Sequence, residues 1–130
     1  MKKHILKVLT IVLVMVMLSI PVSAATPRFN NVSEAVLFMD FDRNYTVYIG
    51  LSVDAYSHGS GVSGLVKLFD SEGTCLEIWS VSDYEKPISQ EFTYPGVKGE
   101  TYTATFAGYA YSNNGTAADR LELEYTAVCN

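Results

Sequence analysis

The sequence predicts an all-β protein, a single antiparallel β-sandwich of about seven strands, and three observations support this fold class. Segments rich in Val, Ile, Tyr, Phe and Thr recur through residues 32–130, and clusters of Gly, Asn, Asp, Ser and Pro separate them, which is typical of an antiparallel sandwich. No stretch after residue 24 keeps apolar residues at positions i, i+3, i+4 and i+7 over three turns, so no helix is expected there. About 100 residues suffice for one domain with a modest core.

Residues 1–24 have the composition of a cleaved secretory signal peptide. A basic start precedes an apolar run over residues 8–20, and Pro21–Ala24 ends in the small residues that a signal peptidase accepts. The apolar run is shorter than the roughly 20 residues that span a bilayer. We therefore expect a secreted, extracellular chain without membrane insertion, with residues 25–31 as a polar lead-in and residues 32–130 as the sandwich.

Alternation of apolar residues with period two indicates the individual strands. The clearest strand is residues 45–54, where the odd positions are all apolar while Thr46, Ser52 and Asp54 are polar, so one face is buried and the other is wet. The strands and connections expected in chain order are a strand at 32–39, a turn at 40–44, a strand at 45–54, a flexible Gly- and Ser-rich loop at 56–64, a strand at 64–69, a tight hairpin at 70–74, a strand at 75–81, a loop at 82–87, a strand at 88–94, a turn at 95–99, a strand at 101–111, a hairpin turn at 113–115 and a strand at 120–129.

Shorter patterns support the later strands. Residues 75–81 carry apolar side chains at both parities, so their facing stays open, and we expect Trp79 in the core rather than in a site. The apolar residues that mark the other strands are Val66 and Leu68 on either side of outward-facing Lys67, then Ile88, Phe92 and Tyr94, then Tyr102, Ala104 and Phe106, and finally Leu121, Leu123, Tyr125 and Ala127 opposite Glu122, Glu124 and Thr126.

Seven strands without crossover helices indicate an immunoglobulin-like or fibronectin-type sandwich. Cys75 and Cys129 are its only cysteines, and in an oxidising compartment one intramolecular disulfide between them is the first expectation. In this topology both cysteines lie at the same end. If the fourth strand stays in the sheet of the last one, however, several strand spacings of about 4.8 Å separate them. The alternatives are two free thiols, or an intermolecular bridge through Cys129.

Three segments, Gly64–Gly73, Ile78–Ser82 and Gly99–Thr105, resemble the uncharacterised small secreted proteins of Firmicutes, which are signal-bearing single domains of about this length. The resemblance covers nearly the whole mature chain, and it implies an immunoglobulin-like fold and export from a bacterial cell, with no catalytic residues to carry over. Its Gly-x-Thr-Tyr pattern is also similar to fibronectin type III domains. There, the tyrosine equivalent to Tyr102 is a tyrosine-corner residue that bonds back to nearby backbone.

The charge of the secreted part restricts its partners. Three of the nine basic residues belong to the signal, so six basic and 14 acidic residues remain and the net charge is −8. Nucleic acids and anionic lipids bind through clustered Lys and Arg, and the sequence contains no such cluster. We expect neither as a partner. An acidic surface serves solubility in any case.

The surplus of tyrosine is the feature that most favours a binding function. The chain has nine Tyr and one Trp, and Tyr48, Tyr109 and Tyr111 fall at the opposite parity from the apolar positions. Exposed tyrosines stack on sugars or anchor protein partners, although cross-strand tyrosines also stabilise an exposed sheet face. We expect binding through these three tyrosines and Tyr56, together with the loop at 56–64, because end loops of sandwiches commonly bind ligands.

One motif suggests a metal. Asp40, Asp42 and Asn44 match the first ligand positions of a calcium loop, but Tyr45 and Leu51 replace the Gly and Glu that an EF-hand requires. A looser calcium site at the sandwich end is the alternative to an ordinary Asp- and Asn-rich hairpin turn. We expect the turn, with no metal ligands and no cofactor.

Two further patterns suggest catalysis only weakly. His58 lies beside several serines, but the glycines around it make a flexible loop instead of a strained nucleophile elbow. Glu122 and Glu124 stand about 7 Å apart on one strand face, where edge protection and solubility explain them. A chain of this size also has little material left for a catalytic cleft.

The sequence thus predicts a non-enzymatic, secreted binding module for a protein or a cell-surface glycan. A secreted toxin, bacteriocin-like protein or inhibitor is the alternative, and killing or inhibition by purified protein would distinguish it. An enzyme is the third possibility, and loss of a measurable activity in a folded His58→Ala variant would support it.

Overall fold

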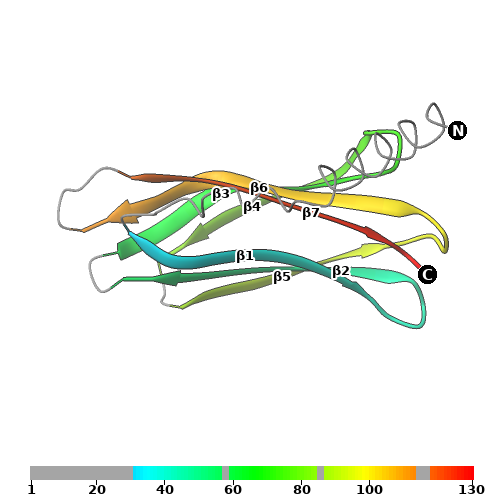
Figure 1. Cartoon of the computed structure of the whole chain (residues 1–130), viewed down its shortest axis with the longest axis horizontal. Helices are drawn as coiled ribbons and strands as arrows, with labels where there is room; N and C mark the ends of the chain where they lie inside the picture. The colour runs from blue at the N-terminus through cyan, green and yellow to red at the C-terminus, as the bar shows by residue number, and fades with distance from the viewer. Residues whose placement is uncertain (1–30, 57–58, 85–86, 114–117) are drawn as a thin grey trace, which may run out of the picture.

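The computed structural model describes residues 31–56, 59–84, 87–113 and 118–130. These residues form seven strands in two packed sheets, which Figure 1 shows as two layers. The expected signal peptide, the lead-in up to residue 30, and His58 lie outside the described residues. The strands are β1 (Val32–Phe41), β2 (Thr46–Ala55), β3 (Gly59–Phe69), β4 (Cys75–Asp83), β5 (Ile88–Pro95), β6 (Thr101–Ser112) and β7 (Asp119–Val128). Within the described part of the chain, no helix has the length and apolarity of a membrane span.

The strands pair antiparallel throughout, so the predicted all-β sandwich class is confirmed. One sheet has the order β1-β2-β5 and the other the order β4-β3-β6-β7. At one side of the sandwich β1 lies against β7. At the other side Trp79 of β4 stacks on Phe92 of β5, with ring centroids 5.2 Å apart, which places Trp79 against the core as expected.

The core fills the space between the two sheets with the inward-facing residues of the alternation. The odd positions of β2 from Val47 to Val53 are almost completely buried, as the pattern predicted. The expected inward set of β6, Tyr102, Ala104 and Phe106, is buried too. Tyr125 lies on the same side of β7 as Leu121, but 40% of its surface stays exposed. β7 is an edge strand, so a large side chain there is covered on one side only.

The predicted flexible loop at 56–64 is wrong from Gly59 onward, because β3 begins there. Residues 57 and 58 of that loop lie outside the described residues. Gly64 lies opposite Gly108 of β6, and a Cβ at Gly64 would stand 2.4 Å from the carbonyl oxygen of Ala107. The glycines therefore serve a close approach of two strand backbones, a recognised use of glycine within a sheet.

The β1–β2 and β3–β4 hairpins use the same turn. In each, an aspartate accepts from two backbone N–H groups, two and four residues later, at 2.8 to 3.0 Å; these are Asp42 and Asp70. The residue before the last turn position has a left-handed backbone, with φ 64° at Tyr45 and φ 80° at Gly73. Glycine adopts this conformation without penalty, whereas a residue with a Cβ does not.

The expected disulfide is absent, because Cys75 and Cys129 are not bonded. Cys75 lies exposed on β4, opposite Phe69, while Cys129 follows β7 and is buried. The sheet order β4-β3-β6-β7 separates their strands by three spacings, about 14 Å, and a disulfide needs Cα atoms within about 7 Å. The fourth strand thus lies in the same sheet as the last one, which is the arrangement that prevents a bridge.

Asn31, the last residue of the expected lead-in, is fully buried. Its backbone N–H donates to Asp119 Oδ2 at 2.6 Å, its side-chain amide donates to the carbonyl of Ala110, and its own carbonyl accepts from the N–H of Tyr56. These bonds join β2, β6 and β7 at one end of the sandwich. Since each satisfies a buried polar group, they order this end.

Candidate functional site

Three exposed tyrosines gather on the outer face of the β4-β3-β6-β7 sheet. The register places Tyr109 opposite Ser63, and Tyr111 opposite Gly61. On the far side of β3, Ser82 pairs with Ser63, and the next outward-facing residue beyond it is Tyr84. We call Tyr84, Tyr109, Tyr111, Ser63 and Ser82 the tyrosine patch.

Local contacts hold two of the three rings in place. The hydroxyl of Tyr111 shares a hydrogen bond with Ser63 Oγ at 2.9 Å across the β3–β6 ladder. One edge of the Tyr84 ring occupies the space above Gly61, where an added Cβ would stand 2.3 Å from Cδ1. Exposed fractions of 68% for Tyr84, 48% for Tyr109 and 37% for Tyr111 leave ring surface open to solvent. The patch is therefore both accessible and partly preorganised.

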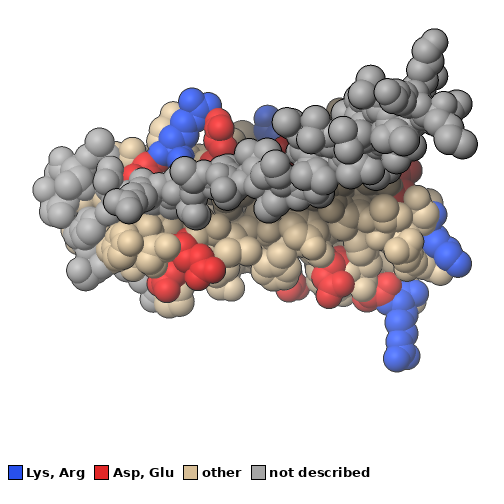
Figure 2. All heavy atoms as spheres, viewed as in Figure 1, with Lys and Arg blue, Asp and Glu red and all other residues tan. Residues whose placement is uncertain are grey.

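The rest of this face continues from the patch toward the other end of the sheet. Leu65 and Ile78 add half-exposed apolar side chains on β3 and β4. On the neighbouring edge strand β7, Arg120 and Glu122 form an exposed ion pair at 2.6 Å. On the side shown in Figure 2, acidic side chains are spread over the surface, and the described residues visible there form no basic cluster.

The structure brings only some of the predicted binding residues together. Tyr109 and Tyr111 share the patch, and Tyr56 lies at the same end, directly after β2. Tyr48 points from β2 to the outer face of the other sheet, where its hydroxyl donates to Asp42 Oδ2 at 3.2 Å. Sequence reasoning missed Tyr84 as a binding residue. It lies in the loop predicted at 82–87, directly after β4, which continues two residues further than predicted, to Asp83.

The outer face of the β1-β2-β5 sheet carries a smaller apolar surface. Val36 and Phe38 of β1 are exposed there, and the Phe38 ring tip fills the space that a Cβ of Gly50 would occupy, 2.0 Å from Cζ. The ring thus covers the glycine backbone of the neighbouring strand. Phe38 accordingly has a packing role.

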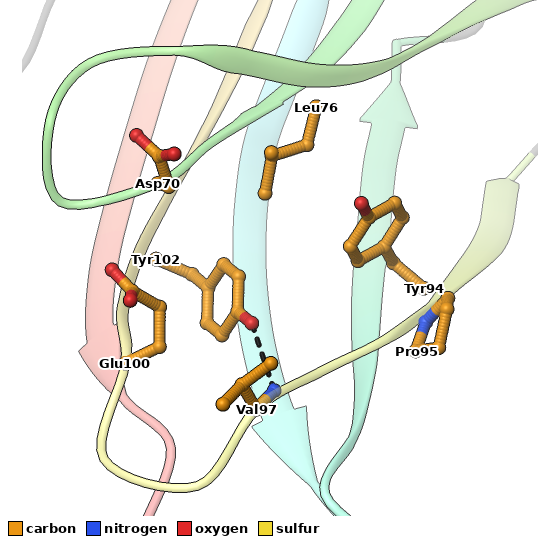
Figure 3. A pocket seen from close by; sticks show the side chains of 7 residues that line it. All are labelled: Asp70, Leu76, Tyr94, Pro95, Val97, Glu100 and Tyr102. Carbon is orange, nitrogen blue, oxygen red and sulfur yellow. Dashed lines mark hydrogen bonds between the residues drawn. The ribbon is translucent and has the colours of Figure 1, made fainter.

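A cavity of about 190 Å³ opens at the opposite end of the sandwich from the tyrosine patch. Figure 3 shows the side chains around it, with Asp70 and Glu100 on one side and Tyr94 on the other. The hydroxyl of Tyr102 accepts a hydrogen bond from the backbone N–H of Val97 at 2.9 Å. This is the bond to nearby backbone that the fibronectin resemblance implied for Tyr102.

The two carboxylates that line the cavity accept hydrogen bonds from backbone N–H groups of the β3–β4 turn. Glu100 Oε1 accepts from the N–H of Ser71 at 3.0 Å, and hydrogen bonds from the hydroxyl and the N–H of Ser71 lower the pKa of the Glu100 carboxyl. Asp70 Oδ1 caps its own hairpin. Burial raises the pKa of the Tyr102 hydroxyl. The Glu100–Ser71 bond thus joins the β3–β4 hairpin to the β5–β6 turn.

Asp42 to Asn44 of the Asp40–Asn44 motif lie in the β1–β2 turn, while Asp40 belongs to β1. The Asp42 carboxylate accepts from the N–H groups of Asn44 and Thr46 and from the Tyr48 hydroxyl. Burial acts to raise the pKa of Asp42, but these hydrogen bonds outweigh it and keep that pKa below its usual value. Among the described residues, no three His, Cys, Asp or Glu side chains are grouped to hold a metal ion.

Comparisons with known proteins add little. No protein-family model matches the chain, and no curated protein matches it. Among solved structures, the chain is similar to the crystal structure of Parabacteroides merdae β-glucuronidase, with a TM-score of 0.47 and 11% sequence identity. The aligned region covers 76% of this chain and 13% of that protein. A likeness of this size bears on neither activity nor substrate.

Proposed function

We propose that this protein is a secreted, non-enzymatic recognition module that binds an extracellular protein or a cell-surface glycan through the tyrosine patch. The signal-like residues 1–24 support export. The carrying observation is the gathering of three exposed tyrosines, with serine hydroxyls between them, on one outer sheet face.

We also infer that the sandwich is of the immunoglobulin-like or fibronectin type. Its division into β1-β2-β5 and β4-β3-β6-β7 suits that topology. The bond from the Val97 N–H to the Tyr102 hydroxyl supports it further, because a tyrosine corner joins the start of the sixth strand to backbone a few residues upstream. A fold of this type leaves its outer faces and end loops free for binding.

Tyrosine and serine suit a recognition surface for physical reasons. A tyrosine ring supplies a large amphipathic contact area at a low cost in side-chain entropy, and serine supplies adaptable hydrogen bonding. The Tyr111–Ser63 hydrogen bond and the seat of the Tyr84 ring above Gly61 reduce that cost further.

The test measures binding of purified residues 25–130 to bacterial and host cell surfaces and to a glycan array. The Tyr109→Ser/Tyr111→Ser double variant should lose binding while it retains the thermal midpoint and circular dichroism spectrum of a folded sandwich. A control, Val36→Ser, removes an apolar side chain from the opposite face whose exposure is similar to that of Tyr111. This control should bind like the parent.

Two results would overturn the proposal. Binding that survives in the folded tyrosine variant but disappears in the control would move the site to the β1-β2-β5 sheet. If the parent binds no surface and no glycan, the recognition function itself is wrong.

A further inference from the structure

We propose that the ligand of the tyrosine patch is an uncharged polysaccharide chain, which stacks its pyranose rings on Tyr84, Tyr109 and Tyr111. This inference rests on the proposed function, and it selects a glycan over a protein partner. It follows from the chemistry of the patch, its charge and its spacing.

The chemistry of the patch matches that of a sugar. Tyrosine rings offer flat apolar surfaces, while the hydroxyls of Tyr, Ser63 and Ser82 both donate and accept hydrogen bonds. Sugar rings have apolar C–H faces and hydroxyls that also donate and accept. The Tyr111–Ser63 contact already shows two hydroxyls of the patch paired with each other at 2.9 Å, an arrangement that a sugar hydroxyl can join.

The charge of the surroundings selects a neutral glycan over an anionic one. Among the residues that the structure describes, the nearest basic side chain by register is Arg120, opposite Tyr109, and the Glu122 carboxylate pairs with it at 2.6 Å. The whole secreted part carries a net charge of −8 by its sequence. An anionic polysaccharide would meet repulsion at this surface, whereas an uncharged one meets none.

The spacing of the rings suits an extended chain. Tyr111 lies on β6, Tyr84 directly follows β4, and the Tyr84 ring lies over Gly61 of the intervening strand β3. The two flanking strands β4 and β6 are two strand spacings apart, about 9.6 Å. Tyr109 and Tyr111 lie two residues apart on β6, about 6.8 Å. Neighbouring or alternate sugars of one extended chain can therefore reach all three rings. Because Gly61 has no side chain, the Tyr84 ring can lie over the central strand.

The experiment measures binding of residues 25–130 to soluble neutral β-glucan, mannan and xylan, with polygalacturonate as the anionic probe, by affinity electrophoresis at low and high salt. We expect at least one neutral polysaccharide to bind with little change in affinity between about 0.05 and 0.5 M NaCl. Tyr84→Ala should weaken that binding roughly two- to tenfold. Gly61→Ala, which displaces the Tyr84 ring, should weaken it similarly, while Val36→Ser on the opposite face serves as the folded control.

Cell-surface binding then separates failure of this inference from failure of the recognition function. Cells are treated either with mild periodate, which cleaves sugar diols, or with protease. Binding lost to periodate and competed by the neutral polysaccharide supports the inference. Binding lost to protease but resistant to periodate shows a protein partner, which overturns the inference and leaves the recognition module intact. Preference for polygalacturonate, or no effect of Tyr84→Ala on glycan binding, also overturns it.

Discussion

Removal of the Tyr102 hydroxyl tests how the β5–β6 turn is held to the sandwich. Tyr102→Phe deletes one oxygen atom and keeps the aromatic ring, whose centroid lies 6.3 Å from that of Phe41. The change therefore removes a hydrogen bond without leaving a ring-sized cavity. The hydroxyl is almost completely buried with its side chain, and the N–H of Val97 loses its acceptor. A lost hydrogen bond with a partly desolvated donor left behind costs about 1.5 kcal/mol.

That cost predicts a measurable shift. For a domain of this size, about 1.5 kcal/mol lowers the thermal midpoint by about 6 to 12 °C, and urea unfolding should show a lower midpoint with an unchanged m-value. Tyr109→Phe is the matched control, because it deletes the same atom on the same strand from an exposed side chain. If the two variants unfold within about 0.3 kcal/mol of each other, the Tyr102–Val97 bond contributes nothing and the reasoning fails.

Three further predictions concern the turns and the thiols. Gly73→Ala should destabilise the protein by about 1 kcal/mol in urea unfolding, because the Gly73 backbone is left-handed. An added Cβ would meet no atom within 4 Å, so the loss would report backbone strain alone. An unchanged urea midpoint would contradict this. The pKa of Asp42 in the folded protein lies below its ordinary value of 3.8, so the ionised carboxylate contributes stability that is lost as the pH falls through the folded-state pKa. Asp42→Asn should therefore lose less stability than the parent between about pH 5 and pH 2. Equal losses would refute this linkage. Ellman's reagent should label Cys75 in the native protein and Cys129 only on unfolding, because burial raises the pKa of the Cys129 thiol; rapid labelling of both would show that Cys129 is accessible.

Most of the strands could be predicted because their signals are local. Alternation within β2 and β6 identifies which side chains face inward from a few neighbouring residues, and burial of Val47–Val53 and of Phe106 follows from it. Turn chemistry is equally local, since an aspartate and a left-handed position define the hairpin at Asp70–Thr74. The number of strands and their class followed from these signals.

The start of β3 could not be predicted in the same way. The run from Gly59 to Gly64 has the composition of a loop, and it becomes a strand by pairing with β6 and, from Val62 onward, also with β4. At Gly64 the benefit of glycine is a close approach to backbone more than 40 residues later in the chain, which no local pattern reports.

The sequence by itself determined an acidic chain with a signal-like start, seven β segments and the inward faces of most of them, because hydrophobic alternation and turn propensity act over short distances. Only the tertiary structure decided which strands share a sheet. Placement of β4 beside β3 separated Cys75 from Cys129, brought Tyr84 to Tyr111, and left Tyr48 on the opposite face. Such proximity depends on strand pairing between distant segments, which is a property of the whole core.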